Sequence, residues 1–553
     1  MSHRPIALLA ALLLAGLLAR DAWPPDETRY ADVARGMSAG EGWLVPHLQG
    51  GVYREKPPVA FWLAAGLVRL GVPVGVAPRA VSGLAALATL ALLPGIAAAL
   101  GLARATASRA SWVLATSPLF LAYAQAGLLD ASATACVSAA IAAKLWRVNK
   151  PAGVRALLVV LEGLALAAAL LTKGPVLLLF PLGLRLGAAL ARERSAASLD
   201  ASDAAVLAVA LCPVGGWLLA AADAAGYSYV RAITIGQVSR RLTGNAPHLR
   251  PLGFLLAVTL VGLLPWTLLG VPLVRLRATW RQRAGMRLGA GHAALLGWIL
   301  LPTLLLSALR TQQPHYLLPA LPALALLLGP SLATPERWAT RSAAALALLA
   351  SGLLLLRACT ASVFTRNVAE IALAADPALR LTLALAAASL LAVVLLPPAA
   401  RVAPWVRAVV GFCAIAVAAL VAVARLDPWM SPRALLQNDA ILRAERLAAP
   451  ETARSAVRIL SGRTEIDATR RKSIGDWLVA EPGRVALVWE RDLERLALGA
   501  TPVEEIGRGY LRARSLVALR ASRATRTGAE RDTLGRHAED VVASRPRGPI
   551  LHR

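Results

Sequence analysis

Long apolar runs constrain this chain more than any other feature of its sequence. Runs rich in Ala, Leu and Val recur from residue 5 to about residue 424, and their lengths suit membrane-spanning helices. Hydrophobic residues make up 57% of the 553 residues and charged residues only 16%, whereas a soluble protein carries about 25% charged residues. The sequence therefore predicts an all-α polytopic membrane protein over this part.

Apolar runs bounded by charge or proline give about thirteen predicted spans. They are expected near residues 5–20, 79–100, 110–127, 131–146, 156–172, 174–190, 204–222, 252–272, 291–309, 316–330, 342–357, 379–398 and 406–424. The first run resembles a signal peptide, but no small-residue cleavage site is convincing and further spans follow it. We expect it to remain as the first helix.

The formal net charge of +27 has two interpretations. Nucleic-acid binding is one, but cytoplasmic loops of membrane proteins are enriched in Arg and Lys. With residue 1 in the cytoplasm, every predicted short inside loop is basic, which favours the second interpretation. The segments then left outside are 21–78, 128–130, 173, 223–251, 310–315, 358–378 and everything after residue 426.

The first outside segment is charged and rich in aromatic residues, although apolar runs flank it. Within it, Glu27–Met37 has helical spacing of apolar and charged residues, and Val59–Leu70 follows the pair Pro57-Pro58. We expect two helices that lie at the membrane surface and frame the roof of a cavity.

After residue 427 the composition changes to that of a small soluble domain. Arg484–Glu490 alternates as a strand does, Arg491–Leu498 suits a helix, and Arg512–Arg520 suits a closing strand. We predict a transmembrane domain with a catalytic first loop, a small α/β domain outside, and a basic disordered tail. Their bounds are 1–426 with the loop at 21–78, then 427–520, then 521–553.

Asp130 and Lys173 are charged residues at the outer ends of predicted spans. Charges in a membrane cost about 2.5–3.5 kcal/mol at mid-span, so those that occur usually face a cavity or a partner. The structural alternatives are a helix N-cap for Asp130 and a lysine that reaches the interface for Lys173. A site is the other interpretation, since both fall on the same predicted side as Asp26.

Several motifs together resemble the bacterial aminoarabinose transferase family, lipid-dependent glycosyltransferases related to protein O-mannosyltransferases. The resemblance covers about residues 5–330. The motifs, in chain order, are DETRY from Asp26, GWLVPHLQG, YREKPP from Tyr53, TSPLFLAYAQAGLLD, LLTKGP, VSRRLTGNAPHLRP ahead of LLPW, and QQPHYLLPALPALALL.

The resemblance implies a GT-C fold of about thirteen helices and a polyprenyl (undecaprenyl) phosphate-linked sugar as donor, used on the outer face of the inner membrane. It implies that an aspartate at position 26 is essential and that the lysine at position 56 contacts the lipid phosphate. The further residues that it implies are Tyr53, Tyr316, Asp130 and Arg240, with Arg241 one position away.

The chemistry of sugar transfer suits these residue types. Breaking a sugar–phosphate bond leaves extra negative charge on the lipid phosphate, which Lys56 and Arg240 would stabilise. An acceptor hydroxyl needs a general base, and the Asp26 carboxylate suits that role. A one-step displacement would invert the anomeric carbon. Asp130 and Glu27, the second carboxylate of the first motif, complete the catalytic candidates.

Supporting roles are open for Glu55, Lys173, His248 and His315. His248, His315 and Glu55 do not have a recognised metal-ligand spacing, so a divalent metal is left open and no cofactor is predicted. Tyr53, Trp43 and Trp62 suit either stacking on a sugar or prenyl chain or an interfacial aromatic belt.

We therefore predict an inverting membrane glycosyltransferase whose partners are a polyprenyl phosphate-linked sugar, membrane lipids, and an acceptor that is lipid A, another envelope glycolipid or a protein. Nucleic acid is not an expected partner. No nucleotide sugar is expected, because no glycine-rich phosphate loop is present. The alternative is a flippase or transporter, which would place charges near mid-membrane. The transferase prediction requires that Asp26, Lys56, Asp130 and Arg240 meet in one pocket.

Overall fold

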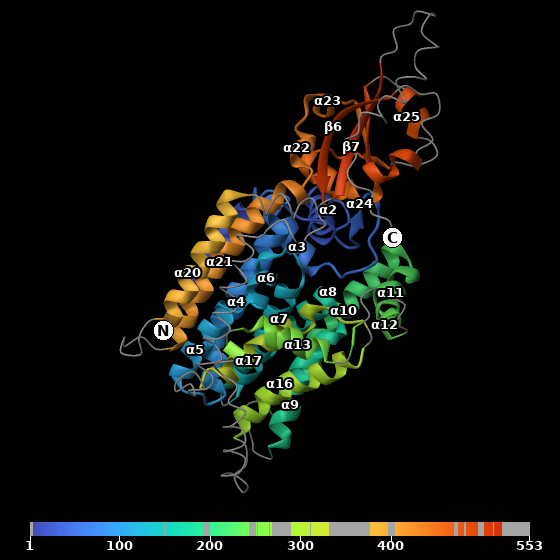
Figure 1. Cartoon of the computed structure of the whole chain (residues 1–553). Helices are drawn as coiled ribbons and strands as arrows, with labels where there is room; N and C mark the ends of the chain where they lie inside the picture. The colour runs from blue at the N-terminus through green and yellow to red at the C-terminus, as the bar shows by residue number, and fades with distance from the viewer. Residues whose placement is uncertain are drawn as a thin grey trace, which may run out of the picture.

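The computed structural model describes a helical bundle and a smaller mixed α/β domain (Figure 1). The described residues are 4–148, 150–191, 200–242, 250–251, 253–264, 266–267, 289–309, 311–330, 376–395, 404–468, 474–480, 483–495, 503–512 and 514–522.

Helices form the first part of the chain, as predicted. They are α1 (Arg4–Leu18), α2 (Asp26–Ser38), α3 (Val59–Arg69), α4 (Ala77–Ala99), α5 (Arg104–Ala115), α6 (Pro118–Gln125), α7 (Asp130–Arg147), α8 (Ala152–Lys173), α9 (Leu179–Leu190), α10 (Ser202–Ala225), α11 (Tyr227–Ile233), α12 (Ile235–Leu242), α13 (Phe254–Gly262), α16 (Ala290–Ser307), α17 (Leu321–Leu328), α20 (Pro377–Leu395) and α21 (Pro404–Met430). Short 3₁₀ turns, η1 (Pro175–Leu178) and η2 (Pro314–Ala320), lead into α9 and α17.

Among the described residues, five helices are long and apolar enough to cross a membrane, or up to six if the bent pair α6–α7 forms one span. The polytopic membrane architecture is therefore as predicted. The number of thirteen spans stays a prediction, since the expected span at 342–357 lies outside the described residues.

The expected single span at 110–127 is wrong. The chain breaks between α5 and α6 at Thr116 and Ser117, and α6 meets α7 at an angle of 112°. The reason is local: a residue that precedes proline avoids helical geometry, and Ser117 ahead of Pro118 is extended, with ψ of 123°. Apolar periodicity alone does not reveal such a break.

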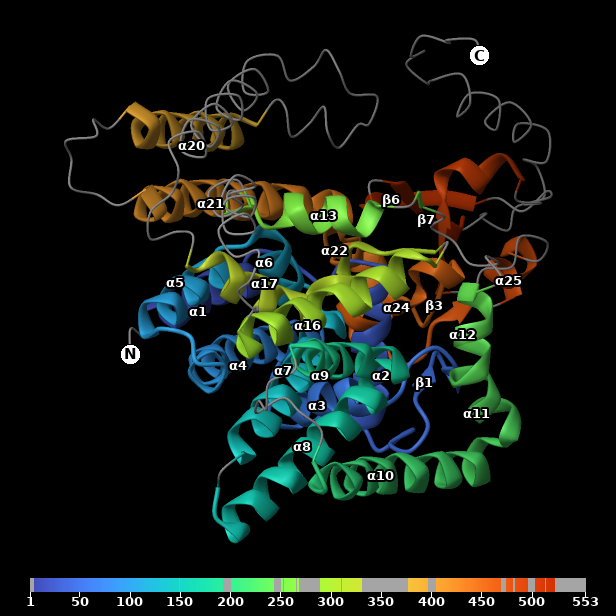
Figure 2. The ribbon, with the colours of Figure 1, turned by 90° about the horizontal axis from the view of Figure 1, so that it is seen from below.

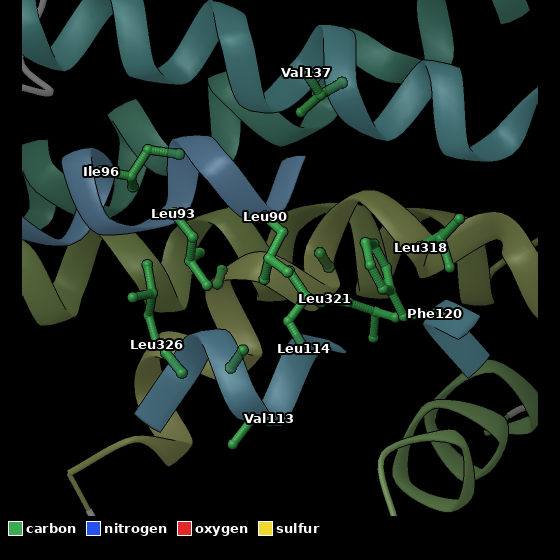
Figure 3. Packing of buried hydrophobic residues seen from close by; sticks show 14 of the residues in the cluster. Leu90, Leu93, Ile96, Val113, Leu114, Phe120, Val137, Leu318, Leu321 and Leu326 are labelled. Atoms are coloured by element: carbon green, nitrogen blue, oxygen red, sulfur yellow. The ribbon is translucent and has the colours of Figure 1, made fainter. Parts of the chain in front are cut away.

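A large apolar core joins α1, α4, α5, α6, α7 and α17 (Figure 3). In the close view, Leu90 and Leu93 of α4 point toward the side on which Leu114 of α5 and Leu321 of α17 lie. Beside this core, α9 and α16 cross in close contact: a Cβ added at Gly187 would lie 2.0 Å from the carbonyl oxygen of Ala293. Small residues of this kind allow membrane helices to pack backbone to backbone.

The two helices predicted in the first outside segment are present as α2 and α3, and their position at the membrane surface stays a prediction. They pack against each other through the Tyr30 and Phe61 rings, whose centroids are 5.4 Å apart. The hairpin β1–β2 (His47–Leu48 and Gly51–Val52) lies between them in the sequence.

The C-terminal domain is a five-stranded mixed sheet with helices, ordered β4-β3-β5-β7-β6. Its strands are β3 (Arg446–Ala449), β4 (Asp467–Ala468), β5 (Arg484–Trp489), β6 (Val503–Leu511) and β7 (Arg514–Ala521), and its helices are α22 (Arg433–Leu436), α23 (Asp439–Leu442), α24 (Glu451–Ser461), α25 (Ile474–Ala480) and the 3₁₀ turn η4 (Glu490–Arg495). The predicted strands at 484–490 and 512–520 are present as β5 and β7, whereas β3, β4 and β6 were not predicted.

The C-terminal domain sits on the end of the bundle where α2 lies (Figure 1), and Figure 2 gives the view from below. Contacts join the two parts: α24 packs on α2, and the Asp21 carboxylate accepts hydrogen bonds from Arg433 and from the Ser431 hydroxyl at 2.8 Å. The domain bounds at 426 and 520 stay predictions, and the predicted tail from 523 on lies outside the described residues.

Candidate active site

A chain of charged groups lies at the N-terminal end of α2. Asp26 is the first residue of this helix, where the helix dipole favours a carboxylate, and it forms an ion pair with Arg29 one turn later. Arg29 also lies 3.5 Å from Glu55, which accepts a hydrogen bond of 3.2 Å from the Tyr53 hydroxyl. The side chains of Asp26, Arg29 and Glu55 are 41%, 31% and 47% exposed, so this group is open to solvent.

The hairpin β1–β2 brings residues 53–56 back to α2. Its two-residue turn has positive φ at both positions, 56° at Gln49 and 81° at Gly50, as a type I′ turn requires. The Tyr53 amide then donates to the Pro46 carbonyl oxygen at 2.8 Å. Glu55 is thereby held beside Arg29.

A second, buried group centres on Asp130, which is 5% exposed. Its carboxylate forms an ion pair with Lys173 and lies 3.8 Å from Nε2 of His315. The Lys173 ammonium lies 5.4 Å from the centre of the Tyr316 ring, and Nδ1 of His315 is 3.3 Å from the Tyr123 hydroxyl.

The structure does not show Asp130 as a helix N-cap or Lys173 as a lysine that reaches the interface. Leu129, rather than Asp130, occupies the N-cap position of α7, and no side-chain cap hydrogen bond forms there. Lys173 does not extend away to the interface, because its side chain is 10% exposed and pairs with Asp130.

The open and buried groups adjoin. Tyr30 lies within electrostatic reach of both the Asp26 and the Asp130 carboxylates, and Lys56 lies within reach of Asp130. Burial, reinforced by nearby negative charge, raises the pKa of the Tyr30 and Tyr53 hydroxyls well above the ordinary value. Both tyrosines therefore stay neutral at physiological pH and can donate hydrogen bonds.

A small hollow, with a cavity volume of about 10 Å³, lies beside the Asp130 group. Asp130, Lys173 and Tyr316 form its polar part. The rest of its lining is mainly apolar, from Ala133, Val176, Leu177, Phe180, Leu306 and Pro319. Charge at one side and hydrocarbon at the other suits an amphiphilic ligand.

Glu27 lies next to Asp26 in the sequence, but its side chain does not join the Asp26 group. Its side chain is 8% exposed and pairs with Arg20 at 2.5 Å, and it accepts hydrogen bonds from the amides of Trp23 at 2.7 Å and Gly127 at 2.9 Å. It ties α2 to the bend between α6 and α7. We therefore withdraw its catalytic role and assign it a structural one.

The expected arginines lie on α12. The side chains of Arg240 and Arg241 are outside the described residues, as is all of His248, so their roles stay predictions. The helix itself adjoins the first loop, because Nε2 of Gln237 lies 3.4 Å from the carbonyl oxygen of Arg54.

Within the described residues, no group of three or more His, Cys, Asp or Glu side chains is arranged to hold a metal ion. Glu55 has Arg29 and Tyr53 as neighbours, whereas His315 has Asp130 and Tyr123. Of the three residues considered for a metal site, Glu55 and His315 therefore have different neighbours, and His248 lies outside the described residues.

Stacking of Tyr53, Trp43 and Trp62 on a ligand does not fit their environments. Tyr53 is 4% exposed, and its ring packs at 5.9 Å against Phe61. The Trp62 indole donates to the Trp43 carbonyl oxygen at 2.6 Å, and the Arg69 guanidinium covers the Trp43 ring at 4.7 Å. All three rings thus have protein neighbours, and Trp62 also packs against a cluster that includes Leu171 and Trp217.

Sequence reasoning missed Arg29 and Tyr30, although both lie in the first motif. The available signal was spacing: Asp26 and Arg29 are three residues apart on a predicted helix, which places them on one face.

Comparisons with known proteins bear on the family and the fold. Residues 6–222 match the family model described as dolichyl-phosphate-mannose-protein mannosyltransferase. Over 309 residues the chain is 31% identical to the undecaprenyl phosphate-alpha-4-amino-4-deoxy-L-arabinose arabinosyl transferase of Edwardsiella ictaluri (strain 93-146), covering 56% of this chain and 55% of the relative. Over 337 residues it is 34% identical to the corresponding protein of Pseudomonas paraeruginosa (strain DSM 24068 / PA7), covering 60% and 59%. Over this part the chain is similar to this glycosyltransferase family.

These matches to the glycosyltransferase family span little more than half the length of the curated relatives. The fold is similar over a longer range. The crystal structure of ArnT from Cupriavidus metallidurans bound to undecaprenyl phosphate superposes with a TM-score of 0.70 at 18% identity, covering 94% of this chain and 98% of that one. Its apo form gives 0.68. The chain thus has the fold of ArnT, a polytopic helical GT-C bundle with a C-terminal mixed sheet.

Proposed function

We propose that this protein transfers a sugar from a polyprenyl phosphate donor to an envelope acceptor at the outer face of the inner membrane. The observation that carries the proposal is the buried pair of opposite charges formed by Asp130 of α7 and Lys173 of α8, which lies beside a hollow with an apolar wall. The names of the relatives, which specify undecaprenyl phosphate as the carrier of their sugar, support it.

The hollow and its surroundings suit the donor. Lys56 and Lys173 present positive charge to a phosphate, and Phe180 and Leu306 offer an apolar wall to the first prenyl units. Lys173 is already paired with Asp130, so its role is shared with that carboxylate. The cations stabilise the charge that develops on the phosphate as the sugar leaves, in a partly dry site where such stabilisation is strong.

Asp26 is the proposed general base. Its pair with Arg29 orients the carboxylate, while its 41% exposure leaves it open to an acceptor. Removal of the acceptor proton by Asp26 and attack opposite the phosphate would complete the transfer in one step with inversion. The Tyr30 hydroxyl interacts electrostatically with both the Asp26 and the Asp130 carboxylates. Because this hydroxyl is neutral, it is a polar group that adds no charge to the site.

Transport is the competing function, and the positions of the charges favour transfer. Asp130 is the first residue of α7 and Lys173 the last of α8, so both lie at helix ends rather than at mid-span. The basic short loops support an outward-facing site. Lipid A, another envelope glycolipid and protein hydroxyls remain the acceptor candidates.

The test is direct. Purified protein is incubated with undecaprenyl phosphate-α-4-amino-4-deoxy-L-arabinose, or another undecaprenyl phosphate-linked sugar, and each acceptor class. Mass spectrometry of the acceptor and release of undecaprenyl phosphate report transfer. We expect a sugar-modified acceptor of inverted anomeric configuration. Reconstituted protein that moves the donor between leaflets while leaving it chemically intact with every acceptor would establish transport instead.

A further inference from the structure

The first loop has two arms, helix α2 and the β1–β2 hairpin, and one hydroxyl group of the C-terminal domain forms hydrogen bonds to both. Ser455 lies on α24 and is 4% exposed. Its hydroxyl donates to Oδ2 of Asp32 at 3.1 Å and accepts a hydrogen bond of 2.8 Å from Nε2 of Gln49. Asp32 is on α2, which begins with Asp26, whereas Gln49 is at the turn of the hairpin that leads to Lys56.

A buried ion pair reinforces this junction. Arg458, on the next turn of α24, lies 3.2 Å from Oδ2 of Asp32, and Arg35 lies 3.5 Å from Oδ1. Asp32 is only 3% exposed. A buried carboxylate is costly unless charged and hydrogen-bonded groups compensate it, and Arg458 and the Ser455 hydroxyl supply such groups to Oδ2 of Asp32 from α24.

The contact between the two arms inside the site cannot by itself set their separation. Arg29 and Glu55 face each other across 3.5 Å with side chains 31% and 47% exposed. Ion pairs that are this exposed contribute little, typically under about 1 kcal/mol. The arms also share an apolar cluster that includes Tyr30 and Tyr53. The buried hydrogen bonds at Ser455 add a directional link between α2 and the turn of the hairpin.

We propose that Ser455 is a positioning residue that fixes the arm carrying Asp26 and Arg29 relative to the arm carrying Glu55 and Lys56. This inference rests on the proposed transferase function. Ser455 does not belong to the site and acts through Asp32 and Gln49. The C-terminal domain thereby takes part in sugar transfer by holding the loop in its reactive geometry.

The test compares the full-length Ser455→Ala variant with the matched control Ser461→Ala. Ser461 lies on the same helix, and its hydroxyl donates to the Val457 carbonyl oxygen of that helix at 2.6 Å. Three quantities are measured: kcat per folded molecule, the Kd for undecaprenyl phosphate, and hydrogen exchange of residues 47–56. A displacement of about 1 Å in a reacting group can lower the rate about a hundredfold. We expect a loop that only becomes more mobile to lower the rate by less.

We expect Ser455→Ala to lower kcat about tenfold, to leave the Kd within about twofold, and to speed exchange in residues 47–56, with Ser461→Ala like wild type. Equal kcat and equal exchange in the two variants would overturn the proposal. If wild type transfers no sugar, the proposed function fails, and the exchange comparison alone decides whether Ser455 fixes the arms. If Ser455→Ala does not fold, Gln49→Ala removes only the hairpin side of the link and decides in its place.

Discussion

The pair formed by Asp130 and Lys173 allows a quantitative prediction. Their side chains are 7% and 10% exposed, so each charge depends on the other. Removal of one member of a buried pair typically costs about 3–5 kcal/mol. In Lys173→Met the short Asp130 side chain cannot leave the protein, and His315 at 3.8 Å is its remaining neighbour in the group. We expect a loss of about 3 kcal/mol of unfolding free energy.

The reverse change should cost less. In Asp130→Asn the lysine side chain is long enough to turn toward the mouth of the hollow, so we expect a loss of about 1–2 kcal/mol. The double variant should lose about 2 kcal/mol less than the sum of the two single variants, because the pair is broken only once. Unfolding in mixed detergent micelles, followed by tryptophan fluorescence, measures these values. Additive losses, or single losses below about 1 kcal/mol, would refute a buried, coupled pair.

Three further predictions concern other parts of the molecule. Lys56→Ala should weaken undecaprenyl phosphate binding roughly tenfold or more in a titration, because a charged hydrogen-bond donor contributes about 1.5–3 kcal/mol. The control Arg54→Ala should bind undecaprenyl phosphate normally. Equal affinities of the two variants would exclude a phosphate-binding role for Lys56. Burial raises the pKa of Asp21, but hydrogen bonds from Arg433 and a neighbouring serine outweigh it and leave the pKa below 3.8, so Asp21 stabilises the fold above that pH and loses its contribution as the pH falls further. Asp21→Asn should therefore flatten the acid limb of a plot of Tm against pH, and an unchanged limb would count against the ion pair. Gly187→Ala would place a methyl group 2.0 Å from a backbone oxygen of α16 and should lower Tm by several degrees; a normal Tm would show that the helices can separate.

The membrane helices and the two helices of the first loop could be predicted because their signals are local. Apolar runs of spanning length indicate membrane helices whatever the tertiary contacts are, and α2 has charged and apolar residues at helical spacing. The break at Ser117 was missed because the apolar pattern continues through it, although Pro118 marked the place.

The roles of individual residues could not be predicted without the three-dimensional structure. Glu27 follows Asp26 directly, but neighbours on a helix point about 100° apart, so one faces the solvent and the other faces Arg20 and the bend before α7. Tyr53 looked suited to stacking, yet tertiary packing buries its ring against Phe61. The link between Asp32 and Ser455 joins residues more than 400 positions apart, and no local pattern predicts it.

The central claim is that Asp26 acts as the base in transfer from a polyprenyl phosphate donor. The most direct measurement is single-turnover release of undecaprenyl phosphate by wild type and Asp26→Asn, alongside donor binding to the same preparations. We expect the amide variant to bind the donor as wild type does, since Asp26 is placed on the acceptor side, and to release no undecaprenyl phosphate. Release at the wild-type rate by a folded Asp26→Asn protein would contradict the account.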